Sequence, residues 1–194
     1  MIRYLFSVLL ATQLIGCASL PPIDQALNDS LMERNRLKVL AINEWRLVGR
    51  LAVRGAKDSW LSRLDWEHGE GFDTLLISTS LGGVVAELRF DGSAIYFTDS
   101  DGTMRIISEG ELEAMLGYVP PIKQLKFWLR GIPEPSRPVI ADKLLISGER
   151  EFMQGTWLVK VERFTKVGDV LLPKKITTIR QGMKVKLVVE KWMN

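Results

Sequence analysis

The chain has 194 residues, a formal net charge of +3 at neutral pH, one histidine and one cysteine. Acidic and basic residues are interspersed, and no basic cluster carries interleaved aromatic side chains, so a nucleic-acid-binding protein is excluded despite a pI near 9.0. The lone cysteine excludes an internal disulfide, and the lone histidine argues against a metal cluster of the usual ligand types. We therefore expect no metal and no cofactor.

The N-terminal segment is typical of a lipoprotein export signal. Arg3 precedes an apolar stretch from Tyr4 to Ile15, which is too short to span a bilayer comfortably because a spanning helix needs about 20 residues. The stretch ends in the lipobox Leu14-Ile15-Gly16-Cys17. We expect residues 1–16 to be cleaved and Cys17 to be the lipidation site, with acyl chains that anchor the mature chain. The alternative is an ordinary buried thiol at Cys17.

The residue after the cysteine bears on the destination of the protein. An aspartate at that position tends to hold bacterial lipoproteins at the inner membrane, whereas this chain has Ala18. We therefore expect an outer-membrane protein, lipid-anchored and facing the periplasm. The prolines Pro21 and Pro22 favour extended backbone, so residues 17–23 are predicted to be a lipidated tether. Residues 24–194 suit a single domain with a sizeable core.

A helix is predicted at the start of the domain. Asp24 is a plausible N-cap, and the pattern reaches toward Ile42. The apolar positions recur at roughly helical intervals with charged residues between them, which indicates an amphipathic helix. These positions are Leu27, Leu31, Leu37 and Leu40.

From Trp45 the apolar period changes to two, which is typical of β-strands. The first strand ends before Gly55 and carries Arg46, Arg50 and Arg54 on one face, where they form either a solvated face or a contact for an acidic partner. Hairpin turns follow at His68–Gly71 and at two Asp-Gly dipeptides, which tolerate the positive φ of tight turns. The further strands predicted before the middle of the chain are Trp60–Trp66, Thr74–Thr79, Val84–Phe90, Ala94–Thr98 and Met104–Ile107.

Two short helices are predicted to interrupt the strands. Ser108 and Glu111 have capping-box spacing at the start of the first, which runs to Gly117, and Pro120-Pro121 opens the second, which runs to Gly131. The strand pattern then resumes at four segments: Lys143–Ser147, Trp157–Val161, Ile176–Ile179 and Lys184–Val189. Such a strand series favours a barrel or curled antiparallel sheet with the helices on its concave side. Periodicity leaves open whether that side holds a cavity or a solid core.

Catalytic chemistry finds little support in the sequence. His68 lies in a predicted turn, where it is poorly placed to act as a general base. Asp65 and Glu67 are two residues apart on one strand face, so they could form a glycosidase-like pair, although a solvated edge is the commoner arrangement. No nucleophile elbow and no phosphate-binding glycine loop is present.

The segment Ser78–Gly83 carries an unusual turn. Leu81 stands between small polar residues and the paired glycines Gly82 and Gly83, where an apolar side chain has no obvious core to enter. Leu81 either points outward, toward lipid or an apolar ligand, or folds back onto its own hairpin.

Taken together, these segments resemble the LolB family of outer-membrane lipoprotein receptors. Each motif is weak alone, but their order and spacing, together with the lipobox, make a chance resemblance improbable. The motifs are Trp45–Arg54, Trp60–Trp66, Leu81-Gly82 after a strand, Pro121–Leu125 leading to Trp128–Pro133, Gln154–Trp157, and Val185–Val189 with Trp192.

The resemblance implies a fold that is mainly β with α: an open, incomplete antiparallel β-barrel, LolA/LolB-like, with helices covering the concave apolar face. It also implies a hydrophobic cavity that shields the acyl chains of an incoming lipoprotein. The candidates for lining this cavity or the core are apolar residues of the strands and of the second central helix: Leu47, Leu51, Leu64, Trp66, Leu125, Trp128, Leu129 and Trp157.

The resemblance further implies a monomeric receptor and not an enzyme. Its partners would be a LolA-like periplasmic lipoprotein carrier, acylated lipoprotein cargo and outer-membrane lipid, with cargo inserted into the inner leaflet. Leu81 with Gly82 matches the family's protruding transfer loop. The family often has proline before this leucine, whereas this chain has Ser80, so we expect a less rigid loop.

Two other classes of function remain open from the residues. A structural or assembly lipoprotein would hold a protein partner on its β surface and would have a filled core. An envelope hydrolase would place Asp65 and Glu67 in a cleft.

Overall fold

The structure, a computed structural model, describes residues 23–55, 59–145 and 148–193. Three helices and eleven strands occupy these ranges. The helices are α1 (Ile23–Leu40), α2 (Glu109–Leu116) and α3 (Ile122–Trp128). The strands are β1 (Trp45–Arg54), β2 (Ser59–Gly69), β3 (Phe72–Ser78), β4 (Val84–Phe90), β5 (Ile95–Asp99), β6 (Met104–Ile107), β7 (Val139–Leu144), β8 (Arg150–Gln154), β9 (Trp157–Val167), β10 (Val170–Arg180) and β11 (Met183–Met193).

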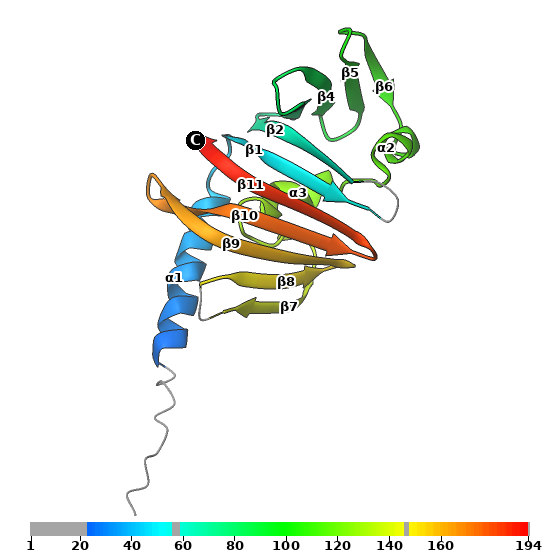
Figure 1. Cartoon of the computed structure of the whole chain (residues 1–194). Coiled ribbons are helices and arrows are strands. Elements are labelled where there is room, and N and C mark those ends of the chain that lie inside the picture. Colours follow the sequence, from blue (N-terminus) through cyan, green and yellow to red (C-terminus); the bar gives the residue numbers. More distant parts are fainter. Residues whose placement is uncertain (1–22, 56–58, 146–147, 194) are drawn as a thin grey trace, which may run out of the picture.

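All eleven strands form one antiparallel sheet in the order β6-β5-β4-β3-β2-β1-β11-β10-β9-β8-β7. Sequence neighbours pair as hairpins, and the first and last strands, β1 and β11, pair at the centre. The sheet curls without closing, because β6 and β7 form its two ends in the described part of the chain. The connection between β6 and β7 carries α2 and α3, and α3 lies behind the central strands in Figure 1. The predicted open, incomplete barrel is confirmed.

The centre of the sheet depends on one glycine. The pairing of β1 with β11 shifts by one residue between Val48 and Gly49. A Cβ atom at Gly49 would lie 2.5 Å from the backbone oxygen of Val188, closer than any side chain tolerates. Only glycine therefore lets the two strands approach at this irregularity.

The core lies on the concave side of the sheet and is rich in aromatic rings. Trp45 lies 5.7 Å from both Trp66 and Trp192, measured between ring centroids. Trp128 packs on Trp157 at 6.1 Å. All five rings are buried, and aromatic packing of this kind stabilises the concave face beyond its simple loss of exposed area.

A buried arginine joins α1 to the segment after α3. The Arg130 guanidinium donates to the backbone oxygens of Val39 and Ile42, both at 3.0 Å, and to that of Lys126 at 3.0 Å. Burial lowers its pKa to about 10. Its donors bind carbonyl groups at the end of α1 and just beyond it, so Arg130 joins this end of the helix to the chain that enters β1.

Helix α1 differs from its prediction in two ways. It already includes Asp24, which is therefore not the N-cap, and it ends at Leu40. Leu31 and Leu37 are about half exposed, because α1 contacts the sheet mainly near its C-terminal end. There Val39 is fully buried and Asn35 exchanges two hydrogen bonds with the backbone of Leu171. No helix in the described ranges is both long and apolar enough to cross a membrane.

The strands after α3 also depart from the prediction. Strand β7 lies at Val139–Leu144, earlier than the predicted Lys143–Ser147, and β8 (Arg150–Gln154) was not predicted. The alternation in β8 is hidden because its inward positions include the polar Gln154 and the half-buried Arg150 beside Phe152. Strands β9, β10 and β11 are each longer than predicted.

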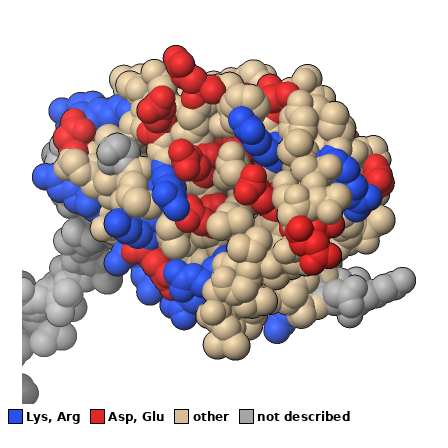
Figure 2. Space-filling model, turned by 90° about the horizontal axis from the view of Figure 1, so that it is seen from above, with Lys and Arg blue, Asp and Glu red and all other residues tan. Residues whose placement is uncertain are grey.

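The outward face of the central strands is a solvated face of paired charges. Arg46 binds the Asp65 carboxylate through two nitrogens at 2.7 and 2.6 Å, which raises the pKa of Arg46. Arg50 and Arg63 share the Glu190 carboxylate at 3.1 and 3.0 Å. Acidic and basic side chains are likewise mixed on the face shown in Figure 2. This arrangement uses Asp65 as an ion-pair partner, not as half of a catalytic pair.

Candidate functional site

An apolar cavity lies between the concave face of the sheet and the segment that carries α2 and α3. It encloses about 60 Å³ of free space. Strands β1–β4, β10 and β11 supply one side, and the chain from Leu116 to Leu129 supplies the other. The lining residues are Leu51, Trp60, Leu64, Trp66, Leu75, Ile77, Leu88, Leu116, Tyr118, Pro120, Ile122, Leu125, Leu129, Ile176, Thr178, Val185 and Leu187.

The free space is small for a ligand. Pockets that hold drug-sized ligands usually measure about 300 Å³ or more, so this space is too small for an acyl chain. We therefore expect a wall of the cavity to move when a chain enters.

The residues predicted for the cavity or core separate into two groups. Leu51, Leu64, Trp66, Leu125 and Leu129 line the cavity. The remaining three lie in the solid core without lining it: Leu47, Trp128 and Trp157.

The lining contains polar groups that the sequence did not single out. Tyr118, between α2 and α3, and Thr178, on β10, line the cavity, and their hydroxyls make no hydrogen bond to the described residues. Burial raises the pKa of Tyr118 to about 12, so its hydroxyl stays protonated as a donor. The Tyr118 ring lies 6.5 Å from the Trp157 ring of β9. No periodicity marks Tyr118, because it lies in an irregular linker.

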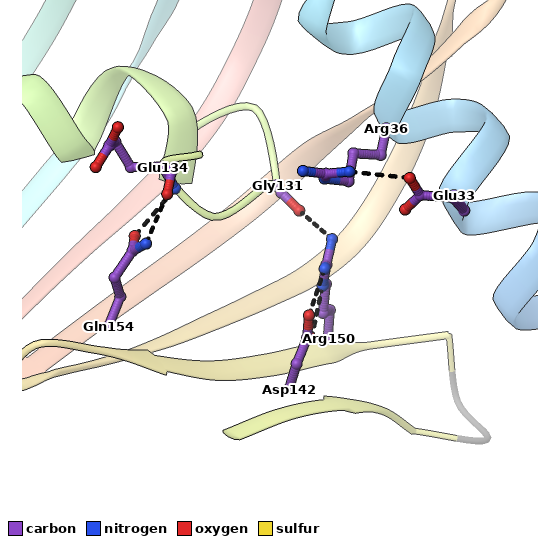
Figure 3. Close-up of polar contacts among 7 residues, drawn as sticks. All are labelled: Glu33, Arg36, Gly131, Glu134, Asp142, Arg150 and Gln154. Atoms are coloured by element: carbon purple, nitrogen blue, oxygen red, sulfur yellow. Dashed lines mark hydrogen bonds and ion pairs between the residues drawn. The ribbon is translucent and has the colours of Figure 1, made fainter. Parts of the chain in front are cut away.

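One wall of the cavity is pinned by polar contacts. The buried Gln154 side chain accepts from Trp128 Nε1 at 2.7 Å and from the Glu134 backbone nitrogen at 3.0 Å. It donates to the backbone oxygens of Glu134 at 2.7 Å and Arg137 at 3.0 Å. Figure 3 shows Gln154 reaching from β8 to the loop that follows α3.

A second clamp holds the same loop. Arg150 donates to the backbone oxygen of Gly131 at 3.2 Å while its other nitrogens bind the Asp142 carboxylate at 2.9 and 2.6 Å (Figure 3). Gly131 has a φ of +82°, and a Cβ there would lie 3.0 Å from Pro173, so glycine suits this close turn. The wall formed by α3 is thereby fixed to β7 and β8.

The other wall is held differently. Helix α2 has a complete capping box in which the Glu111 nitrogen donates to Ser108 Oγ at 3.2 Å and Glu111 Oε2 accepts from the Ser108 nitrogen at 2.9 Å. From Glu109 to Pro121, the only polar link to the sheet in the described residues is an exposed Arg105–Glu111 ion pair of 3.8 Å. Leu112 is buried, so α2 is held to the sheet mainly by apolar contacts.

The loop between β3 and β4 projects from the sheet next to the cavity. Leu81 is 98% exposed, and Val84 and Val85 behind it are about half exposed. Ile77, which lines the cavity, lies two residues before the loop begins at Thr79. Leu81 therefore points outward and does not fold back onto its hairpin.

Two hydrogen bonds close the loop that carries Leu81. The Thr79 nitrogen donates to the Gly83 oxygen at 2.8 Å, and the Gly83 nitrogen donates to Thr79 Oγ1 at 3.1 Å. Gly82 has a φ of +94°, a conformation that glycine adopts readily. These bonds hold the tip that presents Leu81, although Ser80 stands where the family often has proline.

The residues considered for catalysis do not form a catalytic site. His68 lies near the end of β2 and not in the turn where it was predicted, and its Nδ1 contacts Asp73 Oδ1 at 2.7 Å across the β2–β3 hairpin. Asp73 also accepts a hydrogen bond from Trp66 Nε1 at 2.9 Å, so its carboxylate satisfies the polar atom of a buried core side chain. No cluster of metal-ligating side chains occurs in the ranges that the structure describes.

A curled antiparallel sheet that covers an apolar cavity, with an exposed leucine at its edge, defines a class of protein that shields apolar ligands. The chain belongs to the outer-membrane lipoprotein LolB family, because the model of that family matches residues 43–192. The resemblance seen in the sequence and the outer-membrane location are thus confirmed.

Full-length relatives carry the same description. The chain is 27% identical over 183 residues to the outer-membrane lipoprotein LolB of Nitrosococcus oceani, covering 92% of this chain and 91% of the relative. It is 29% identical over 197 residues to that of Alkalilimnicola ehrlichii, covering 98% and 96%. Among solved structures, a LolA superfamily protein from Nitrosomonas europaea is 9% identical with a TM-score of 0.49, covering 85% of this chain and 92% of that one.

Proposed function

We propose that this outer-membrane lipoprotein receives acylated lipoproteins from a LolA-like periplasmic carrier, shields their acyl chains in the cavity, and inserts them into the inner leaflet of the outer membrane. The single observation that carries the proposal is the pairing of an apolar cavity with a neighbouring loop whose leucine is 98% exposed. Membership of the LolB family, whose members are receptors and not enzymes, supports it.

Transfer of this kind is driven by differential affinity. Each acyl methylene contributes about 0.8 kcal/mol when it leaves water, so a chain must stay shielded throughout the hand-off. A carrier whose opening meets the cavity mouth satisfies this condition without nucleotide or covalent chemistry. In this proposal the cavity widens as acyl chains enter and narrows when they leave, and this narrowing favours their release into the membrane.

Leu81 is the candidate contact with the membrane. An exposed leucine costs little in stability, yet it gains about 1.5–3 kcal/mol when it enters an apolar phase. Val84 and Val85 widen the apolar tip behind it. We propose that this tip engages the inner leaflet while cargo leaves the cavity, with Gly82 allowing the turn that presents Leu81.

The test is Leu81→Glu in a reconstituted transfer assay with loaded carrier and outer-membrane vesicles. We expect insertion of cargo to fall at least about tenfold, because a carboxylate opposes entry into lipid, while the thermal midpoint stays unchanged. The matched control is Leu145→Glu, an exposed leucine between β7 and β8 at the opposite end of the strands. Insertion unchanged in Leu81→Glu contradicts the role of the loop.

The proposed anchor lies outside the described residues, as do the signal peptide 1–16 and most of the tether. We propose that lipid on Cys17 positions the cavity and plays no part in binding. A soluble Cys17→Ala form is then expected to bind acylated cargo with unchanged affinity while losing its outer-membrane location. Loss of cargo binding in that form contradicts this division of roles.

A further inference from the structure

The cavity holds polar groups that an apolar chain does not need. Thr178 and Tyr118 are lining residues that carry hydroxyls, and neither hydroxyl has a hydrogen-bond partner in the part of the chain that the structure describes. Thr178 is 3% exposed, so bulk water does not solvate it freely. A hydroxyl left without a partner in an apolar site is unfavourable, and it persists where a ligand or an ordered water satisfies it.

A third hydroxyl, that of Ser62, belongs to the sheet side of the cavity, as Thr178 does, but Ser62 is not among the lining residues. Ser62 is 9% exposed, and its Oγ is buried without any partner. It lies on the same face of β2 as Trp60 and Leu64, both of which line the cavity, and it pairs with the lining residue Leu51 of β1. If the cavity widens toward β2, Ser62 lies where it can contact the acyl ligand that enters.

The three hydroxyl-bearing residues lie toward one end of the cavity. The Tyr118 ring lies 6.5 Å from that of Trp157, which begins β9 at this end. The strand register puts Ser62, Thr178 and the lining residue Trp60 toward the end of the sheet where β1 leads to β2 and β10 leads to β11. Ile77, which precedes the Leu81 loop, lies toward the same end. The cavity is thus apolar toward its other end, where Leu75, Leu88 and Leu129 line it, and carries hydroxyls toward the loop.

We infer that Thr178, Tyr118 and Ser62 form a polar collar that donates hydrogen bonds to the carbonyl oxygens where acyl chains join their glyceryl or amide head. This inference rests on the proposed function and names the part of the ligand that these residues recognise. Ester and amide carbonyls are acceptors only, which suits hydroxyl donors. The collar sets how deeply the chains enter, because methylene groups pass it and carbonyls stop at it.

The probes are dioctanoylglycerol and its ether counterpart, dioctylglycerol, which has the same chains and lacks the carbonyls. Binding to the purified full chain is followed by tryptophan fluorescence, to which Trp60 and Trp66 of the cavity wall contribute. The ester is expected to bind roughly tenfold more tightly than the ether, as one or two hydrogen bonds to carbonyls would give. Thr178→Val and Tyr118→Phe are each expected to remove a several-fold part of that preference while ether binding stays unchanged.

The matched control is Thr177→Val, since Thr177 is also buried but lies on the opposite face of β10. It is expected to leave both affinities unchanged. Ser62→Ala, on another strand of the same sheet, supplies a further variant if Thr178→Val fails to fold. Equal affinity for ester and ether in the unaltered chain, or a preference that survives Thr178→Val, Tyr118→Phe and Ser62→Ala, overturns the collar alone. Failure to bind either probe overturns the proposed function as well.

Discussion

The two helical segments over the concave face are attached to the sheet in opposite ways. The loop after α3 is held by the buried Gln154 and by Arg150, which together make five hydrogen bonds to backbone or indole groups of this segment. Helix α2 has its polar bonds satisfied within itself and contacts the sheet through apolar side chains such as Leu112. Polar clamps hold one geometry, whereas apolar contacts tolerate sliding, so we predict that the cavity widens on the α2 side.

The largest effect is expected where the pinned wall is broken. Gln154→Ala leaves the indole of Trp128 and the backbone of Glu134 without partners, and buried polar groups without partners are costly. We expect the free energy of unfolding to fall by about 3 kcal/mol. Chemical denaturation followed by tryptophan fluorescence measures this change.

The control for that variant is Gln181→Ala, an exposed glutamine in the β10–β11 turn. It is expected to change the free energy of unfolding by no more than about 0.5 kcal/mol. A loss for Gln154→Ala as small as this would mean that the α3 side is not pinned, and the contrast between the two walls would disappear.

A smaller and local effect is expected on the α2 side. Ser108→Ala removes the N-cap of α2, a change that typically costs about 1 kcal/mol. Hydrogen exchange of the α2 amides is expected to accelerate roughly fivefold, with no change in β1 or β10, because α2 opens separately. Ser100→Ala, in the exposed β5–β6 turn, is the matched control.

The same variant, Ser108→Ala, tests whether α2 moves when a ligand enters the cavity. If α2 is the moving wall, Ser108→Ala also speeds uptake of an acyl probe. Equal acceleration of exchange across the central strands would show instead that α2 opens only with the whole sheet.

The smallest effect concerns pH. Hydrogen bonds from the Ser108 backbone and hydroxyl to the Glu111 carboxylate lower the pKa of Glu111 below its ordinary value of 4.5. Because the folded-state pKa is lowered, the stabilisation of α2 is fully present above 4.5 and is lost as the pH falls through the lowered value. NMR signals of the Gly110 and Gly117 amides are expected to report this loosening on acidification, and Glu111→Gln is expected to abolish it. An identical pH response in Glu111→Gln would contradict this origin.

Much of the fold could be predicted because alternation and turn residues are local signals. The meander before α2, the capping box at Ser108 and the glycine turns all follow from short-range patterns. Strand β8 was not predicted because Gln154 is a buried polar residue whose hydrogen-bond partners lie on a distant loop. Its inward position depends on tertiary contacts that no local pattern encodes.

The site was less predictable than the fold. Leu47 and Leu51 lie four residues apart on the same face of β1, yet Leu47 is fully buried in the core and Leu51 lines the cavity. Which of them faces free space depends on where α2 and α3 cross the sheet. Leu81 could be singled out because a turn offers a leucine nothing to pack against, and its exposure needs no distant partner.

The pairing of β1 with β11 makes the order of synthesis matter. The central seam of the sheet joins Arg46–Arg54 to Lys184–Met193, so the two halves of the barrel have no common backbone ladder until the last residues of the chain are available. Such distant pairing slows folding, because a long loop must close before the contacts form. The complete sheet therefore forms only after β11 has been made, although the hairpins of each half have ladders of their own.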